Sequence, residues 1–156
     1  MTIAPPIRPL LLLDVDGVLL AVRDPVDDRL ADPEPSLHPD ALDWMVELAG
    51  SFDLVWATTW HDLANRLLAE RLGLRPLPFI EFTMDHRAPT PKLPSVIEFV
   101  GDRPCAWIDD DLHEDADTWA AGRPVPTLLV HVASDEGMAR RHVDQLLGWA
   151  AGFEEG

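Results

Sequence analysis

The amino-acid sequence predicts an α/β fold, a Rossmann-like three-layer sandwich with a mainly parallel five-stranded sheet. Short unbroken apolar runs, of which residues 10–13 are the clearest, are typical of strands buried on both faces of a parallel sheet. Segments with apolar residues at helical spacing alternate with these runs, which indicates βαβ units. The length of 156 residues fits a single domain, 1–156, with a core of about 8–151.

Five apolar runs bounded by turn residues supply the expected strands, at residues 8–13, 52–57, 77–82, 105–108 and 126–132. Helical periodicity marks five segments between and after them, at residues 36–50, 61–72, 92–100, 112–121 and 137–151. Gly50 and Gly73 end the first two helices, and Pro94 fits the first turn of the third. The spacing assigns these side chains to the inner faces of the first, second and last helices: Leu42, Met45, Val46 and Ala49; Leu63, Leu67, Leu68 and Leu72; Met138, Val143, Leu146, Leu147 and Ala150.

Residues 21–36 interrupt this alternation. They are rich in proline and acidic residues and show little periodicity, so we expect a loop or short flap. The segment leaves the carboxyl end of the first strand, which is where open α/β sheets bind their ligands, and it could lean over a substrate there. A solvated connector explains the same composition equally well.

Composition argues against several classes of protein. Asp and Glu number 28 against 12 Lys and Arg, a formal net charge of -16. This charge disfavours a nucleic-acid partner, because nucleic-acid affinity comes largely from basic residues. The single cysteine, Cys105, argues against a disulfide framework and a thiolate zinc site. No apolar run reaches transmembrane length and no signal peptide is evident, so we expect a cytoplasmic protein without a membrane partner.

Two acidic residues, Asp14 and Asp16, directly follow the first strand, and Gly17 lets the chain turn sharply after them. Carboxylates at positions i and i+2 can together hold a hard cation such as Mg²⁺, which prefers oxygen ligands. Alternatively, one can attack an electrophile while the other, protonated, donates a proton to a leaving group. Two solvated aspartates at a strand end are the simpler alternative.

Polar residues also follow two later strands. Thr58 and Thr59 end the second strand just before a helix, whose free N–H groups favour an anion, although either residue could be an ordinary helix cap. Asp109 and Asp110 end the fourth strand.

The run LLLLDVDGVLL at residues 10–20 resembles the first motif of the haloacid dehalogenase-like (HAD) superfamily, a hydrophobic strand followed by DxDx(T/V)(L/V). The remaining motifs follow in order. LVWATTW resembles the strand that ends in Thr or Ser, Lys92 lies at the start of a helix as the motif lysine does, and CAWIDDDLHED resembles the strand that ends in paired aspartates. The resemblance covers nearly the whole chain and implies that Asp14 and Thr58 end neighbouring strands.

The resemblance implies a Mg²⁺-dependent phosphatase that acts through an aspartyl-phosphate intermediate. Asp14 would attack phosphorus, and Asp16 would protonate the leaving oxygen and later activate water. Thr58, with Thr59 as the alternative, and Lys92 would hold the phosphoryl oxygens. Lys92 is the only lysine in the chain, which suggests a role that needs a compact ammonium; an incidental surface lysine is the alternative.

The resemblance also implies a metal site. Mg²⁺ would be held by Asp14, the backbone carbonyl of Asp16 and the carboxylate of Asp110, with Asp109 as the next choice. The acids that follow in the same segment are expected to be outer partners of this site or solvated surface residues: Asp111, Glu114 and Asp115.

Many HAD proteins carry an inserted cap domain, but the intervals 20–52 and 60–92 leave no room for one, so we expect a capless core. Trp60 and His61 could line the mouth of the site, although core packing and an ordinary first helical turn explain them equally well. An open site suits bulky substrates, or small ones when another subunit supplies a lid, so a homo-oligomer stays open. A small-molecule phosphate ester is the expected substrate.

Three alternatives compete with this function. The same residues would support transfer of the phosphoryl group to an acceptor other than water. A non-catalytic regulatory or binding protein could keep the fold, although it would need none of these residues. An end-processing phosphatase for nucleic acid would need a basic groove with clustered arginines, which the overall charge does not favour.

Overall fold

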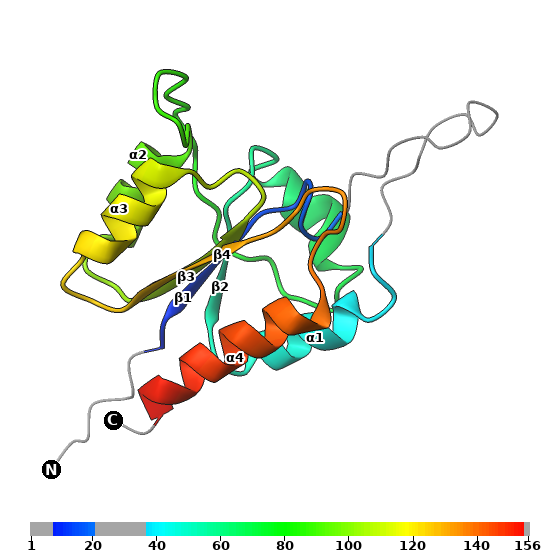
Figure 1. The fold of residues 1–156 in the computed structure, drawn as a ribbon. Coiled ribbons are helices and arrows are strands. Elements are labelled where there is room, and N and C mark those ends of the chain that lie inside the picture. The colour runs from blue at the N-terminus through cyan, green and yellow to red at the C-terminus, as the bar shows by residue number, and fades with distance from the viewer. Residues whose placement is uncertain (1–7, 21–36, 155–156) are drawn as a thin grey trace, which may run out of the picture.

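A single parallel sheet forms the centre of the computed structural model, which describes residues 8–20 and 37–154 (Figure 1). Its strands lie in the order β2-β1-β3-β4, and β1 is buried along its whole length, as its leucine run predicts. The α/β fold with a parallel sheet is therefore confirmed, whereas the expected flap at 21–36 lies outside the described residues. The strands are β1 (Leu10–Leu13), β2 (Asp53–Trp56), β3 (Cys105–Asp109) and β4 (Thr127–His131).

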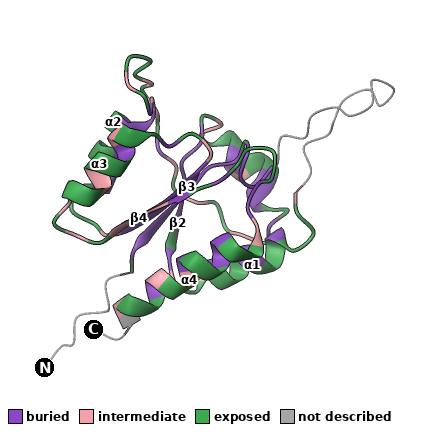
Figure 2. Ribbon diagram, in the orientation of Figure 1, coloured by how far each residue is buried: buried purple, intermediate pink, exposed green. Residues whose placement is uncertain are grey.

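Helices cover both faces of the sheet. On one face lie α1 (Ala41–Ala49) and α4 (Arg140–Glu154), and on the other α2 (Leu93–Val100) and α3 (Glu114–Gly122) (Figure 1). Side chains alternate along β1, so Leu11 and Leu13 join one hydrophobic core and Leu10 and Leu12 the other. Figure 2 shows the central strand β3 buried and the outer helix surfaces exposed.

The fifth expected strand, 77–82, is not a strand. Only Phe79 bridges to β2, through a pair of backbone hydrogen bonds that Trp56 makes with the residues on either side of Phe79. Pro76 and Pro78 carry no N–H and cannot extend this ladder, so pairing stops at one bridge. The described residues therefore form a four-stranded sheet, with this segment running along its β2 edge.

Two of the expected helix faces are also wrong. In α1, Leu42 and Val46 are 44% and 59% exposed, and the buried stripe is Ala41, Trp44, Met45 and Leu48. The second expected helix is a short π-helix, η1 (Asn65–Ala69), flanked by turns, and its Leu63 and Leu67 face solvent. In α4 the expected inner residues are buried except Leu147, which is partly buried.

The strand register aligns the residues that follow the strands. Leu13 pairs with Trp56 on one side and with Ile108 on the other, so the next residues, Asp14, Ala57 and Asp109, stand level at one edge of the sheet. The carboxyl edge of the sheet is therefore where the polar groups converge.

None of the helices in the described ranges combines the length and apolar character that crossing a membrane would require.

Candidate active site

The ammonium group of Lys92 lies at the centre of this edge. Its Nζ donates to Asp14 Oδ1 at 3.0 Å, to Asp109 Oδ2 at 2.8 Å and to the backbone carbonyl of Ala57 at 2.9 Å. These three bonds use all three of its hydrogens and join the ends of β1, β2 and β3. The lone lysine of the chain is thus buried in the site, and not an incidental surface residue.

Three carboxylates gather around this ammonium. Asp14, Asp109 and Asp110 each offer an oxygen, and these oxygens lie within 4.8 Å of one another. Burial and the charge of Asp109 raise the pKa of Asp14, against the opposing effect of Lys92. Burial alone would lower the pKa of Lys92, but the two facing carboxylates outweigh it and raise that pKa.

This donor set fits a hard divalent cation. Three carboxylates and one ammonium leave excess negative charge in a largely buried space, and a cation bound to oxygen ligands would neutralise it. Asp109 Oδ2 already accepts from Lys92 and from the indole N–H of Trp107, so its free capacity is smaller than that of Asp110. The carboxylate of Asp16 lies outside this cluster, so of that residue only the backbone carbonyl stays a predicted ligand.

A close approach between Gly17 and Asp110 shapes the cluster. Gly17 has φ of +78°, a left-handed conformation that a side chain disfavours, and a Cβ atom built there would overlap the Asp110 carboxylate. The turn after β1 therefore passes directly against the acid that follows β3. Glycine at this position is required both by the turn and by the neighbouring carboxylate.

The segment after β2 forms a tight turn next to the cluster. Thr58 is buried, and its Oγ1 accepts the amide N–H of Trp60 at 3.2 Å within this turn; no helix begins at Thr58, and the hydroxyl can still donate its own hydrogen. Thr59 is exposed. His61 has φ of +52°, rare for a residue with a side chain, and its Nε2 accepts the amide of Phe82 at 3.3 Å.

This turn brings Trp60 to Asp16. The indole N–H donates to Asp16 Oδ2 at 3.0 Å, and it holds an otherwise exposed carboxylate beside the cluster. The sequence predicted Asp16 as a catalytic acid and left Trp60 open between the mouth of the site and the core, but nothing in it indicated this bond. Trp60 is only partly buried, and it packs against the core as well as facing the site.

A second set of hydrogen bonds that supports the site was not predicted from the sequence. The carboxylate of Asp115, at the start of α3, accepts both the amide and the hydroxyl of Thr90, at 3.0 and 2.6 Å. Thr90 is fully buried and lies two residues before Lys92, and its Oγ1 also accepts the amide of His113. Asp115 therefore anchors the loop that carries the lysine.

Fold and site together define a HAD-like α/β protein, with acids after β1 and β3, a threonine after β2 and a lysine ahead of α2. A family model agrees: the HAD domain in Swiss Army Knife RNA repair proteins matches residues 10–143. The match covers well over half of the chain, and the protein belongs to this family. No curated protein matches the chain.

Proposed function

We propose that this protein is a Mg²⁺-dependent phosphomonoester hydrolase that acts through an aspartyl-phosphate on Asp14. The observation that carries the proposal is the Lys92 ammonium held between Asp14 and Asp109 at the carboxyl edge of the sheet. Burying charged groups in this way has a high desolvation cost, so a role in binding alone gives little reason to keep them. Membership of the HAD family supports hydrolase chemistry.

Asp14 and Asp16 have different roles in this reaction, the first as nucleophile and the second as general acid and base. A carboxylate oxygen of Asp14 forms a bond to phosphorus as the bond to the leaving oxygen breaks, and Asp16 gives its proton to that oxygen. A water molecule then attacks phosphorus, its proton passes to Asp16, and the bond to Asp14 breaks to release inorganic phosphate. Their burial fits these roles, because Asp14 is enclosed and Asp16 is exposed to leaving group and water.

The other residues of the site would position the Asp14 carboxylate and stabilise the charge that develops on the phosphoryl group. Lys92 fixes the orientation of the Asp14 carboxylate, and its positive charge would stabilise the phosphoryl oxygens as charge shifts onto them, while the Thr58 hydroxyl would donate a hydrogen bond to one of those oxygens. Mg²⁺, bound by Asp14, Asp110 and the Asp16 carbonyl, would offset the repulsion between an anionic nucleophile and an anionic phosphate. Asp109 serves mainly to hold the lysine.

The substrate we propose is a small phosphate ester, taken up by a single capless domain in the cytoplasm. Between the second and third motifs η1 is the one named helix or strand, which supports a site without a cap domain on that side. Thr59, Trp60 and His61 border this mouth and would contact the ester group. A second subunit could serve as a lid, which a measurement of oligomeric state with and without substrate would reveal.

A phosphorylated RNA end is the second candidate substrate. The description of the matching family favours it, because it names RNA repair proteins. The formal net charge of -16 opposes extensive contact with a polyanion, so such a substrate would have to be held near its end. Both candidates present the same reacting group, a phosphate monoester, to the same aspartates.

Hydrolysis of p-nitrophenyl phosphate with Mg²⁺ or with EDTA tests the reaction. We expect Mg²⁺-dependent turnover, its loss in Asp14→Asn, and its retention in Asp117→Asn, a matched change of an exposed aspartate on α3. Mass spectrometry after acid quenching should find a phosphate on wild-type Asp14. Equal rates in wild type and Asp14→Asn would refute the mechanism, phosphoryl products with added alcohols would indicate a transferase, and inactivity across a broad panel of esters would favour a binding protein.

A further inference from the structure

A groove of about 690 Å³ opens beside the candidate active site, and Leu20 and Trp60 form the end of it nearest Asp16. Trp60 donates its indole N–H to Asp16, and Leu20 bridges to Asp16 through the backbone. Because Asp16 would protonate the leaving oxygen, the group attached to that oxygen must leave in this direction. The groove is therefore where the leaving group of a bound phosphate ester would lie.

The lining of the groove combines an aromatic ring with positive charge. Arg66 and Arg71 contribute guanidinium groups, and Glu70 is the one carboxylate among the described lining residues. Excess positive charge is unusual in a chain whose acids outnumber its bases by 28 to 12. Guanidinium groups bind phosphate with paired hydrogen bonds, and the faces of tryptophan rings stack on nucleobases.

The π-helix explains how two arginines five residues apart come to line one groove. Arg66 lies in η1 (Asn65–Ala69), where hydrogen bonds run between residues five apart and the turn is wider than in an α-helix, and Arg71 follows in the turn two residues after its end. Such turns are rare and often occur at functional sites. An ordinary α-helix would direct these two side chains apart.

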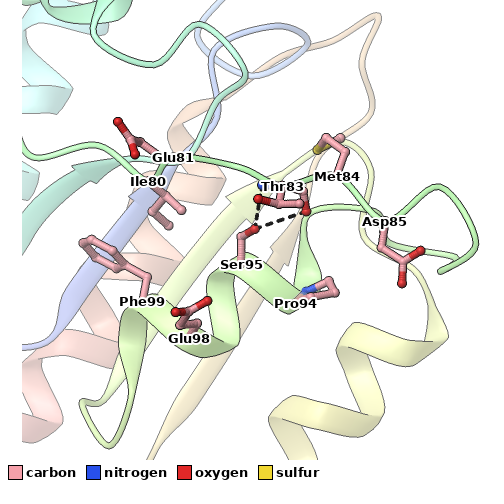
Figure 3. A pocket seen from close by; sticks show the side chains of 9 residues that line it. All are labelled: Ile80, Glu81, Thr83, Met84, Asp85, Pro94, Ser95, Glu98 and Phe99. Atoms are coloured by element: carbon pink, nitrogen blue, oxygen red, sulfur yellow. Dashed lines mark hydrogen bonds between the residues drawn. The ribbon is translucent and has the colours of Figure 1, made fainter.

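Two other hollows lack this combination. The one between α2 and the segment before it, shown in Figure 3, is lined by three carboxylates, Glu81, Asp85 and Glu98, and by no lysine or arginine, so it would repel a phosphate. The other lies at the amino ends of the strands, opposite the site, and two of its arginines, Arg8 and Arg103, are already paired with Asp53.

We propose that the groove is a leaving-group subsite for a nucleotide that carries a second phosphate besides the one removed. Trp60 stacks on the base, and Arg66 and Arg71 bind the second phosphate. This inference rests on the proposed hydrolase function and specifies its substrate class. A free nucleoside 3′,5′-bisphosphate and an RNA end with a terminal 3′-phosphate both have this chemistry.

Steady-state kinetics with Mg²⁺ on paired substrates test the subsite. We compare a nucleoside 3′,5′-bisphosphate with the 3′-monophosphate of the same nucleoside, in wild type, Arg66→Ala and Arg71→Ala. The matched control is Arg75→Ala, an exposed arginine that lines the hollow at the amino ends of the strands. Loss of one charge-assisted contact should raise KM for the bisphosphate by about 10-fold or more, with KM for the monophosphate and kcat changed less than about 2-fold.

The result that overturns the proposal is an equal change for both substrates, or none. Two further arms refine it: an abasic 3′,5′-bisphosphate should bind more weakly if the base stacks on Trp60, and a short RNA with a 3′-phosphate separates the two sources of ligand. Direct binding of the bisphosphate to Asp14→Asn and to Asp14→Asn/Arg66→Ala, by calorimetry, needs no turnover. Weaker binding to the double variant supports the subsite even if the proposed hydrolysis fails, and unchanged binding rejects it.

Discussion

Replacing Lys92 with methionine is the sharpest test of how the site is held together. Methionine keeps most of the length and the apolar stem of lysine but has no charge. In the wild type Nζ lies 3.0 Å from Asp14 Oδ1 and 2.8 Å from Asp109 Oδ2, and the lysine is only 9% exposed. The substitution leaves two buried carboxylates facing each other without a counter-ion.

The cost follows from this burial. Removing one partner of a buried ion pair typically costs about 3–5 kcal/mol, because the remaining charge stays desolvated. A carboxyl group can escape part of this cost by binding a proton, and the pKa of Asp14 is already raised by burial and by Asp109. We therefore expect the low end, about 3 kcal/mol, which lowers Tm by on the order of 10 °C in a chain of this size.

The stability of the Lys92→Met variant should depend on pH in a defined direction. A carboxyl group whose pKa is higher in the folded state than in the unfolded state binds its proton more tightly when folded, so stability falls as pH rises above the unfolded value of about 4. Without Lys92, Asp14 loses the charge that opposed this shift. The variant should therefore lose stability between pH 5 and pH 8 more steeply than the wild type.

Urea unfolding at pH 5 and pH 8 in EDTA measures both the loss of unfolding free energy and its dependence on pH. The double variant Lys92→Met/Asp109→Asn should recover part of the lost stability, because it removes one of the two opposed charges. Phosphate ester hydrolysis should fall by about 100-fold or more in the single variant, the usual effect of removing a donor to transition-state charge. An unfolding free energy within about 1 kcal/mol of wild type at both pH values would refute the reasoning.

Three further changes test other parts of the structure. Gly17→Ala should weaken Mg²⁺ binding, measured by calorimetry, because its Cβ would displace the Asp110 carboxylate; unchanged affinity would contradict the close approach. Asn65→Ala should lower the free energy of unfolding by roughly 2–4 kcal/mol, because Trp56 Nε1 and the Leu77 amide lose their acceptor and the Leu77 carbonyl loses a donor; a urea unfolding curve unchanged from wild type would contradict this. Burial lowers the pKa of His142, so stability should fall as pH drops below 6.5; the urea midpoint should decrease more between pH 7.5 and 5.5 in wild type than in His142→Asn, and equal decreases would contradict this.

The strands were predictable where burial alone determines them, and the inner faces of the first two helices were not. The apolar runs at β1 and β3 carry their own signal, since four consecutive apolar residues bounded by turn residues are typical of a short strand buried on both faces. The helix at α1 offers two overlapping stripes, through Leu42 or through Ala41, and both contain Met45. Contact with the sheet and α4 decides which stripe is buried, and the local spacing of apolar residues cannot predict that contact.

The chemistry of the site was visible in the sequence because each acid directly follows a buried strand. The links between those residues were not visible, because they join segments far apart in the chain: Trp60 lies 44 residues from Asp16, and Thr90 lies 25 from Asp115. The π-helix is hidden for the same reason. Asn65 bonds to Trp56 and to the segment at Leu77, and these contacts hold a turn that no local propensity favours.

The acidic composition and a nucleotide substrate are compatible because the two act over different distances. At physiological ionic strength charges are screened beyond about 8 Å, so most of the net charge of -16 is not felt by a phosphate lying beside Arg66 and Arg71. A long nucleic acid would meet acidic surface beyond that groove and gain little from each added phosphate. Affinity for 3′-phosphorylated RNA should therefore stop rising after the first one or two nucleotides and should fall only weakly with salt. A steep salt dependence that grows with RNA length would show instead that a wider basic surface exists.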